Sequence, residues 1–368
     1  MLNIIVNSGH SFIKLRKSLV KKFLEKQKVN LFLPNNVNNI LKEFSEKNLN
    51  VKKINIVDKK KNFFILIKNS YNLFKKISKA NNKNVYIIFG TYMNLIFGIL
   101  SFFVASKKNI YVFTGLGSFF NSKNKLLIFI LKKFLNLLIF KKKTIFVFYN
   151  YADRNYLVKK KYFYKTIIIP GSGIKIIKNE NNKIIKKKIK FVFFSRLNYD
   201  KGILELINAI KIVNSRGFNK DYELFIYGLF DNNPTTILKK DLLLLIKNIN
   251  NCHFTEVDYK VSLKKILGNK HVFVLPSYRE GLPKTALEAM NFKNALLLSK
   301  IPGHLKLINK KKLNGLYFKK KNEIELSNKI IWMIKNKNYL KKFMINSYTN
   351  LSAFSEKKIN KKFYEISK

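Results

Sequence analysis

Two glutamates stand eight residues apart in the run HVFVLPSYREGLPKTALEAM, which covers residues 271–290. This run predicts a buried strand, a tight polar loop and a helix, at residues 271–276, 277–282 and 283 onward. Proline suits a helix start, because the N–H that it lacks has no partner there. Glu280 then lies in the loop, and Glu288 lies about 12 Å farther on at 1.5 Å per residue. Acids so spaced suit the two ends of one ligand.

The loop between these acids also has the features of an anion site. Gly281 lets a ligand approach the backbone without a side chain in the way. The backbone N–H groups that follow, together with the helix dipole, favour a negatively charged group such as phosphate.

Two basic residues stand close together earlier in the chain, in Ser195-Arg196-Leu197 and Asp200-Lys201-Gly202. The surrounding pattern predicts that Arg196 and Lys201 lie between a strand and a helix. Two fixed positive charges there would stabilise a departing diphosphate, on which negative charge develops as its bond breaks.

Composition narrows the class of protein. The 368 residues are enough for two domains, and the hydrophobic content of 47% is that of a globular chain. Cys252 is the one cysteine, which excludes an internal disulfide. The net charge of +53 would favour nucleic acid or an anionic membrane. The basic residues are mostly lysines spread over the whole chain, however, and this favours compositional drift over a dedicated basic patch.

Strand-like and helix-like segments alternate through the chain in two series, which predicts parallel sheets with helices on both faces. The lysine-rich and asparagine-rich residues 178–188 are a plausible linker or surface loop. We predict an N-terminal domain at 1–170, a second domain at 171–335 and terminal helices at 336–368 that pack back toward the first domain. Sites in such open sheets lie at the carboxyl ends of the strands.

Two apolar segments raise the question of a membrane. Residues 85–106 carry no charge and are long enough to cross a bilayer, but Gly90-Thr91 divides them, which favours a strand followed by a helix. Residues 126–140 are apolar nearly all round and adjoin lysines, which suits either an interfacial helix or a core helix. Residues 1–6 do not have the pattern of a secretory signal.

The run at 271–290 resembles the E-x7-E signature of family 4 retaining glycosyltransferases, enzymes of the two-domain GT-B fold, and R-L-x-x-D-K-G at 196–202 resembles a second motif of that family. The resemblance implies that Glu280 contacts the sugar of a nucleotide-sugar donor and that Glu288 holds the ribose. It also implies that Arg196 and Lys201 bind the diphosphate, that backbone at Gly281 and Leu282 cradles phosphate, and that Gly9 faces it across a cleft.

Positions in the N-terminal half resemble the subgroup that elongates sugars on a polyprenyl-diphosphate carrier. They are Asn7, Phe12, Arg16, Thr91, Asn94, Gly98, Thr114–Gly117, Asn150, Asp153 and Pro170–Gly173, which includes Ser172. Among these, Asn150 and Ser172 are predicted substrate-binding residues. The resemblance implies surface-polysaccharide or glycan assembly at the inner face of the cytoplasmic membrane, with a lipid-linked acceptor and an anionic membrane surface as partners.

The sequence departs from the family pattern at two places. Phe89-Gly90 stands where many relatives carry a histidine, and Pro302-Gly303-His304-Leu305-Lys306 stands where relatives read P-G-C-R-E. The histidine that relatives carry is therefore absent from that position, and His10, beside Gly9, is the candidate general base.

The sequence shows no D-x-D at a strand end and no histidine pair at ligand spacing, so we expect neither a metal nor a cofactor. We therefore predict that the protein is a retaining, metal-independent hexosyltransferase that uses a nucleotide sugar, expected to be UDP-linked. One alternative is the same fold acting on a soluble acceptor. The other is a non-catalytic, basic nucleic-acid-binding protein, although no recognised nucleic-acid module is present.

Overall fold

The chain folds into two compact units, each described here by itself. The computed structural model describes residues 1–34, 47–55, 63–77, 83–116, 125–141, 143–178, 185, 187–231, 235–258 and 260–368. The first unit comprises Met1–Gly173 with Glu356–Lys368, and the second comprises Ile174–Ser355. The boundaries expected from the sequence stood after residues 170 and 335. The expected linker at 178–188 lies largely outside the described residues.

The first unit is built on a sheet of seven parallel strands in the order β3-β2-β1-β4-β5-β6-β7. Its strands are β1 (Leu2–Val6), β2 (Val29–Pro34), β3 (Leu49–Ile54), β4 (Val85–Phe89), β5 (Lys108–Phe113), β6 (Thr144–Phe148) and β7 (Thr166–Ile168). Strands β1 and β4 are buried along their whole length, which explains their continuous apolar runs.

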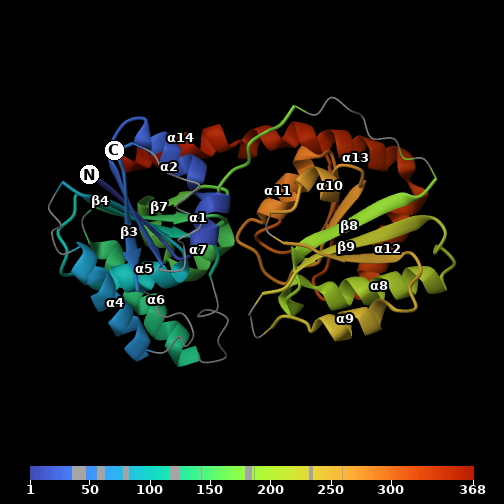
Figure 1. Ribbon diagram of the computed structural model, residues 1–368, viewed down its shortest axis with the longest axis horizontal. Coiled ribbons are helices and arrows are strands. Elements are labelled where there is room, and N and C mark those ends of the chain that lie inside the picture. Colours follow the sequence, from blue (N-terminus) through green and yellow to red (C-terminus); the bar gives the residue numbers. More distant parts are fainter. Residues whose placement is uncertain are drawn as a thin grey trace. The chain divides into compact units, whose positions relative to one another are not determined.

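Helices cover both faces of this sheet (Figure 1). They are α1 (Gly9–Leu15), α2 (Lys17–Leu24), α4 (Phe63–Ile77), α5 (Thr91–Leu100), α6 (Lys125–Phe140), α7 (Tyr151–Leu157) and α14 (Glu356–Ser367), with a 3-10 turn, η2, at Lys160–Lys165. Helices α2 and α14 lie on one face, and α4, α5 and α6 lie on the other.

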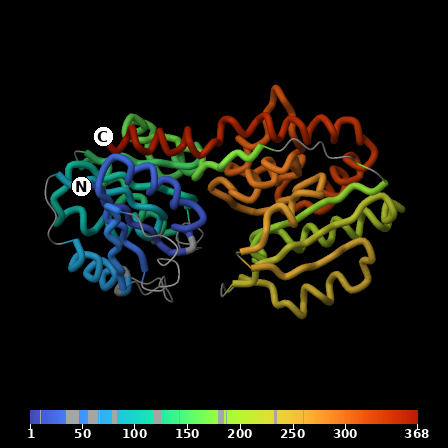
Figure 2. The backbone as a smooth tube through the Cα atoms, turned by 45° about the horizontal axis from the view of Figure 1, so that its top comes forward, coloured from blue at the N-terminus to red at the C-terminus, as the bar shows by residue number. Residues whose placement is uncertain are grey.

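The last helix, α14, belongs to the first unit although it is the end of the chain (Figure 2). The ring of Phe363 packs 5.7 Å from that of Phe89, and Tyr364 packs 6.0 Å from Phe23. The Asn360 amide donates a hydrogen bond to the Ser18 hydroxyl at 3.0 Å. These contacts make α14 part of the first unit's core.

The second unit has a sheet of six parallel strands in the order β10-β9-β8-β11-β12-β13. Its strands are β8 (Ile189–Arg196), β9 (Tyr222–Leu229), β10 (Cys252–Glu256), β11 (Val272–Leu275), β12 (Ala295–Ser299) and β13 (Gly315–Phe318). The sheets of both units confirm the predicted α/β class with parallel sheets.

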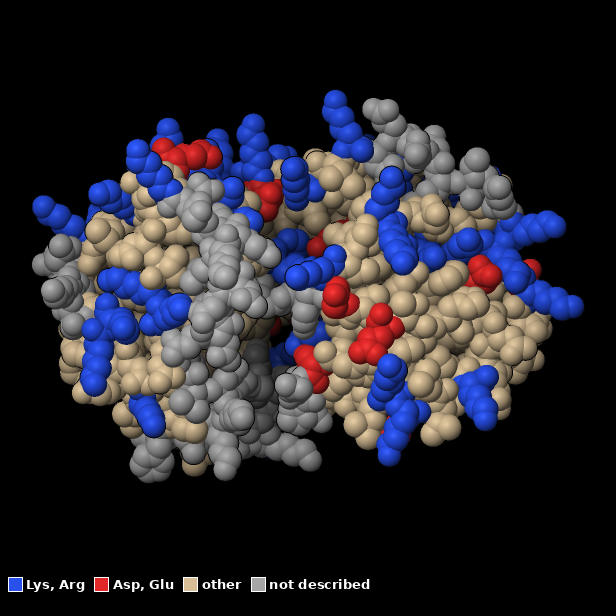
Figure 3. Space-filling view, in the orientation of Figure 1, with Lys and Arg blue, Asp and Glu red and all other residues tan. Residues whose placement is uncertain are grey.

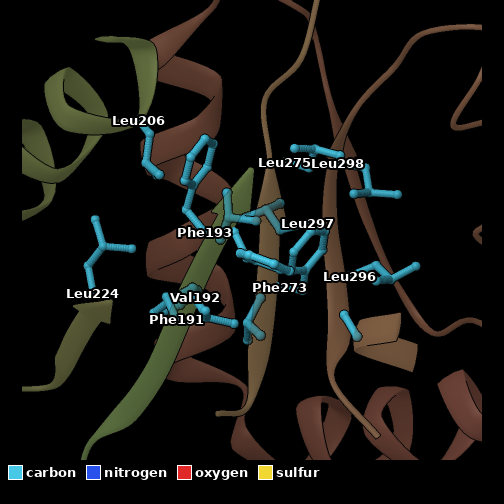
Figure 4. Close-up of a cluster of buried hydrophobic side chains, with 14 of the residues drawn as sticks. Phe191, Val192, Phe193, Leu206, Leu224, Phe273, Leu275, Leu296, Leu297 and Leu298 are labelled. Atoms are coloured by element: carbon cyan, nitrogen blue, oxygen red, sulfur yellow. The ribbon is translucent and has the colours of Figure 1, made fainter. Parts of the chain in front are cut away.

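Helices also cover both faces of the second sheet. They are α8 (Ile203–Ser215), α9 (Lys239–Ile246), α10 (Leu263–Leu267), α11 (Lys284–Asn291), α12 (Glu323–Lys335) and α13 (Lys337–Asn350), with 3-10 turns η3 at Tyr199–Lys201 and η4 at Leu351–Phe354. The buried side chains of neighbouring strands pack together in one cluster, which includes Phe191, Phe193, Phe273 and Leu297 (Figure 4). Complete burial of each such side chain contributes about 1.5–3 kcal/mol, so the middle of the sheet is a firm support for the loops at its ends.

The structure settles how residues 85–106 fold. They form β4 and the ten-residue helix α5, divided at Gly90, whose φ of 98° suits glycine. Most of α5 is buried in the core of the first unit. Among the described helices, none is both long and apolar enough to cross a membrane.

Helix α6 combines the two alternatives considered for residues 126–140. Leu131, Leu135 and Leu138 are buried in the core. On the other side, large apolar side chains remain in solvent, and between 54% and 67% of their surface is exposed: Leu126, Phe129, Ile130, Leu137 and Phe140. The helix is therefore a core helix with an uncovered apolar face.

Candidate active site

The motif residues of the second unit meet at the carboxyl edge of its sheet. Strands β8 and β11 are parallel neighbours, so the loops that follow them leave the same edge. The loop after β8 carries Lys201, and the loop after β11 carries Glu280. The fold thus joins two motifs that are 79 residues apart in the chain.

Lys201 and Glu280 form a close ion pair. Lys201 Nζ lies 2.6 Å from Glu280 Oε1, and the side chains are only 10% and 15% exposed. Ser277 Oγ donates a second hydrogen bond to Oε1 at 3.0 Å. A charge-assisted bond shielded from water is stronger than one at the surface. One oxygen of the carboxylate is therefore held firmly by two donors.

The backbone around Gly202 brings the two loops together. Gly202 has a φ of 73°, and a Cβ at this position would lie 2.3 Å from the Pro276 carbonyl oxygen. The Tyr278 N–H donates to the Asp200 carbonyl at 2.8 Å. Only glycine permits both this φ and this close approach. The glycine of the D-K-G motif is therefore required by the structure, because it lets the loop that carries Lys201 pack against the loop after β11.

The electrostatic surroundings keep Glu280 ionised. Burial by itself raises the pKa of this carboxyl, but the Lys201 ammonium and His304 act in the opposite direction, together with hydrogen bonds from Lys201 and Ser277, and the net result is a lowered pKa. The site thus presents a carboxylate at neutral pH.

Arg196 lies at the end of β8 and pairs with a different acid. Its Nη1 is 3.1 Å from Asp231 Oδ2, and 45% of the arginine side chain is exposed. Thr236 Oγ1 donates to Asp231 Oδ1 at 2.6 Å, which fixes that carboxylate. Sequence reasoning placed Arg196 and Lys201 at one point. The structure gives each its own acid, and Asp231 was not among the predicted residues.

The remaining predicted residues of this unit follow β11. Gly281 is buried and Leu282 half-buried in the loop, and Pro283 is the residue before α11 rather than its first residue. Glu288 lies within α11 and is 8% exposed. The two acids of the E-x7-E run therefore occupy a loop and the following helix, as the spacing predicts.

A residue that sequence reasoning did not place in the site is His304. Its side chain is fully buried, and Nδ1 lies 2.8 Å from the Ser299 carbonyl oxygen. Ser299 Oγ donates in turn to the Ser277 carbonyl at 2.5 Å. A Cβ on Gly303 would lie 2.2 Å from the Glu280 carbonyl oxygen. The sequence could have indicated this position through Pro302-Gly303, which marks a loop after β12 and therefore lies at the carboxyl edge of the sheet.

The predicted residues of the first unit lie near the carboxyl ends of its strands. The sequence pattern predicts a loop at residues 7–10, but Gly9 is the first residue of α1 and Ser8 caps this helix. His10 is also in α1, but its side chain lies outside the described part of the structure. Asn150 is buried and caps α7, with Oδ1 accepting from the Asp153 N–H at 2.8 Å. Asn150 thus has a structural role that the sequence did not indicate.

Two further positions complete this edge. Ser172 stands in a turn between Gly171 and Gly173, each with a φ of 74°. Arg16 is 2% exposed and donates to the Tyr149 hydroxyl at 2.7 Å, while its guanidinium lies 4.2 Å from the centre of the Phe89 ring. Burial lowers the pKa of Arg16.

The part of the chain that the structure describes shows no metal cluster, and its drawn face shows no single basic patch. Within the described residues, no group of three or more His, Cys, Asp or Glu side chains is arranged to hold a metal ion. Basic side chains are scattered over the drawn face of both units rather than gathered at one place (Figure 3).

Comparison with known proteins gives matches over this site and over the whole fold. Residues 175–350 match the family model "Glycosyl transferases group 1". A stretch of 131 residues, 34% of this chain and 33% of the relative, is 30% identical to the capsular polysaccharide biosynthesis glycosyltransferase CapM of Staphylococcus aureus. That match therefore spans only about a third of CapM.

A longer match covers 83% of this chain and 82% of a Campylobacter jejuni protein, at 27% identity. That protein is an N,N'-diacetylbacillosaminyl-diphospho-undecaprenol alpha-1,3-N-acetylgalactosaminyltransferase. The structure of Anabaena HepE in complex with UDP superposes with a TM-score of 0.73 at 14% identity, over 99% of this chain and 98% of HepE. The matched residues 175–350 contain the whole carboxyl-edge site of the second unit, so this part of the chain is similar to the group 1 glycosyl transferases, and both units have the parallel sheets of the GT-B fold class.

Proposed function

We propose that this protein transfers a hexose or N-acetylhexosamine from a UDP-linked sugar to a lipid-linked saccharide, with retention of the anomeric configuration and without a metal ion. The transfer would serve polysaccharide or glycan assembly at the inner face of the cytoplasmic membrane. The observation that carries the proposal is the shielded Lys201–Glu280 pair at the carboxyl edge of β8 and β11.

The chemistry assigned to the pair follows from its charges. When the bond from the sugar to the diphosphate breaks, negative charge grows on the leaving phosphate. The Lys201 ammonium, seated by Gly202, meets that charge, and Arg196 adds a second cation from the end of β8. Glu280 then binds the sugar ring, while Glu288 holds the ribose. The departing phosphate itself accepts the acceptor hydroxyl's proton, so the reaction does not depend on His10.

The identity of the donor nucleotide and of the acceptor rests on the relatives. HepE binds UDP, which supports a UDP-linked donor. The name of the Campylobacter relative describes an undecaprenyl-diphosphate-linked acceptor, and that match extends over both units. We therefore assign the lipid-linked acceptor to the first unit, near the carboxyl ends of its strands.

The exposed face of α6 is the surface that we assign to the membrane. Near it, Phe103 of the turn after α5 is 75% exposed, and Lys141 Nζ lies 4.3 Å from the centre of the neighbouring Phe102 ring. The Phe140 ring packs 5.1 Å from Tyr162. Aromatic and aliphatic side chains in solvent would gain free energy by burial at a lipid interface.

The charges around this face suit anionic headgroups. Between Asp58 and Glu180 the only acidic residue is Asp153, and its side chain is buried. Lysines 132, 133, 141, 160, 161 and 165 lie on or close to α6 and η2. Each basic residue near an anionic bilayer contributes about 1 kcal/mol.

The test is a transfer assay with purified protein and acceptor lipid in vesicles. A panel of UDP-linked and GDP-linked sugars would be supplied in the presence of a metal chelator, and the product's anomeric configuration would be read by NMR. We expect transfer from one UDP-sugar with retention, lost in Lys201→Ala and Glu280→Gln.

Other outcomes would replace the proposal. Transfer to a water-soluble acceptor, unchanged by vesicles, would keep the enzyme class and remove the lipid-linked acceptor. Binding of every polyanion equally, with a steep salt dependence and no effect of Lys201→Ala, would favour a nucleic-acid-binding protein.

A further inference from the structure

His304 carries a buried nitrogen for which the described structure offers no partner. A carbonyl oxygen only accepts, so the 2.8 Å contact with Ser299 shows that Nδ1 carries the proton. In the neutral ring, Nε2 is then an acceptor, and it is buried without a hydrogen bond. Such a group costs about 1–3 kcal/mol of stability, so its retention calls for a functional reason.

The charged groups that act on this imidazole are those of the active site. Burial lowers the pKa of His304 to about 4, Glu280 raises it, and Lys201 lowers it. The ring is therefore neutral while Lys201 remains beside Glu280. Tyr317 adds only a hydrogen bond from its hydroxyl to the His304 carbonyl at 2.9 Å.

Donor binding would change the balance among these three groups. In the structure Lys201 holds Glu280 Oε1. In the proposed function the same ammonium also faces the diphosphate of the donor, so its single positive charge is shared between two anions. Glu280 then loses part of its opposing charge in a setting where 15% of its side chain is exposed. Ser277 still donates to this largely buried carboxylate, but the loss of opposing charge is costly, so a second cation would stabilise it.

We propose that His304 is a positioning residue that takes over from Lys201 as the partner of Glu280 when a nucleotide sugar binds. Nε2 takes up one proton from solvent and donates it as a hydrogen bond toward the Glu280 carboxylate. The imidazolium so formed keeps Glu280 ionised and oriented against the sugar, and Nδ1 remains bonded to Ser299. No covalent bond forms or breaks in this step.

This inference rests on the proposed function, because it needs a diphosphate at Lys201. It goes further in predicting that donor binding and proton uptake are coupled. The removal of a nearby cation and the arrival of a dianion both favour the protonated imidazole. Uptake should therefore grow as the pH falls from about 7.5 to about 5.5, since the ring is the group that gains charge in that range.

The experiment is calorimetry of UDP-glucose and UDP-N-acetylglucosamine binding in pairs of buffers with different heats of ionisation. The diphosphate of a nucleotide sugar has no titrating group near neutral pH, so uptake reports on the protein. Two variants separate the two ring nitrogens. His304→Asn keeps a donor near the position of Nδ1, and His304→Gln places an amide near that of Nε2.

We expect the wild type to take up a fraction of a proton, increasing toward low pH. In His304→Asn, binding should persist without that uptake, and kcat should fall by about tenfold or more with little change in KM. His304→Gln should restore part of kcat, since its amide donates to Glu280 without a proton. Thermal unfolding of both variants controls for misfolding.

The outcomes distinguish the two proposals. Nucleotide-sugar binding with equal proton uptake in the wild type and His304→Asn, or binding without uptake, would overturn the role of His304 and leave the proposed function standing. Binding that is absent, or unaffected by Lys201→Ala, would overturn the proposed function and the role of His304 with it.

Discussion

Thirteen of the 20 acidic residues belong to the second unit and seven to the first, although the two units are nearly equal in length. In the second unit the acids have defined places. Asp231 holds Arg196, and Glu280 holds Lys201. In the first unit the long segment between Asp58 and Glu180 has a single acid, the buried Asp153. The second unit therefore uses carboxylates to arrange the cations of its site, whereas a long segment of the first unit has many lysines and a single acid in its sequence.

The helices show the same contrast. Helix α11 of the second unit buries six of its eight residues, from Ala286 to Asn291. Helix α6 of the first unit leaves five large apolar side chains in solvent. A shared α/β plan therefore supports two kinds of surface, and this difference is the basis for the division proposed above, in which one unit carries the chemistry and the other contacts lipid. The predictions that follow test this division.

The largest effect is expected for Lys201→Ala. It removes the cation assigned to the diphosphate and leaves the shielded Glu280 carboxylate without its partner. Loss of a preorganised transition-state contact of this kind lowers kcat by about 100–1,000-fold. Steady-state transfer rates at saturating donor measure this directly.

The matched control is Lys239→Ala in the same unit. Lys239 also pairs with a glutamate, Glu256, at 2.7 Å, but these side chains are 56% and 49% exposed. Exposed pairs contribute about 0–1 kcal/mol, so the rate should not change. An equal loss in both variants would show that general charge, and not the site, supports activity.

Gly202→Ala should act on the stability of the second unit. The positive φ and the approach to the Pro276 carbonyl both resist a side chain, and the cost is about 2–5 kcal/mol. Gly217→Ala is the comparison, because its φ of 86° is similar but nothing lies within 4 Å of the added Cβ. Urea unfolding should show a loss of only about 1–2 kcal/mol there. Equal losses would mean that the contact between the two loops adds nothing.

The double change Phe129→Ser with Leu137→Ser tests the first unit's surface. Both side chains are more than half exposed, so folding is little affected, while binding to vesicles with anionic lipid should weaken by about tenfold. Sedimentation with vesicles measures it. Leu243→Ser with Leu244→Ser, exposed on α9 of the second unit, should bind vesicles like the wild type. If this second pair weakens binding as much, the division between units is wrong.

The smallest effect appears only in acid. Glu280 has a lowered pKa in the folded chain, so its stabilising contribution is complete above its ordinary value of 4.5 and is lost as the pH falls through the lowered value. His304, with a pKa near 4 against 6.5 ordinarily, loses stability as the pH falls from about 6.5 to about 4. The unfolding midpoint should therefore fall with decreasing pH in the wild type. Below about pH 4.5 this fall should be smaller in Glu280→Gln, and between about pH 6.5 and 4 it should be smaller in His304→Asn.

Much of the fold could be predicted because central strands are apolar without interruption. The continuous apolar runs at 85–89 and 144–148 predict strands, and both form strands, β4 and β6. Of the strand expected at 54–57, residues 56 and 57 lie outside the described residues, and Ile54 is the last residue of β3, which begins at Leu49. It is the edge strand and is only partly buried, with lysines at 52 and 53, so its apolar signal is weak.

The site was predictable only as separate motifs. The runs around Lys201 and Glu280 have distinctive residue types, and the carboxyl-edge rule for open sheets places them together. The partners could not be read in the same way. Which acid each cation selects depends on distances across the sheet edge, so Asp231 and the pairing of Lys201 with Glu280 emerged only from the fold. In the sequence His304 was only a departure from the family pattern. The fold shows that its side chain is buried and interacts with Glu280 and Lys201.

The passage of the chain from the first unit to the second at residue 173 and back at residue 355 has a consequence for biosynthesis. The ribosome releases α14 only after the entire second unit has been made. Phe89 and Phe23 of the first unit therefore lack their partners from α14 until that helix has left the ribosome. The second unit is continuous in sequence and can complete its sheet earlier, so nascent chains should acquire protease resistance in residues 174–355 before they acquire it in residues 1–173.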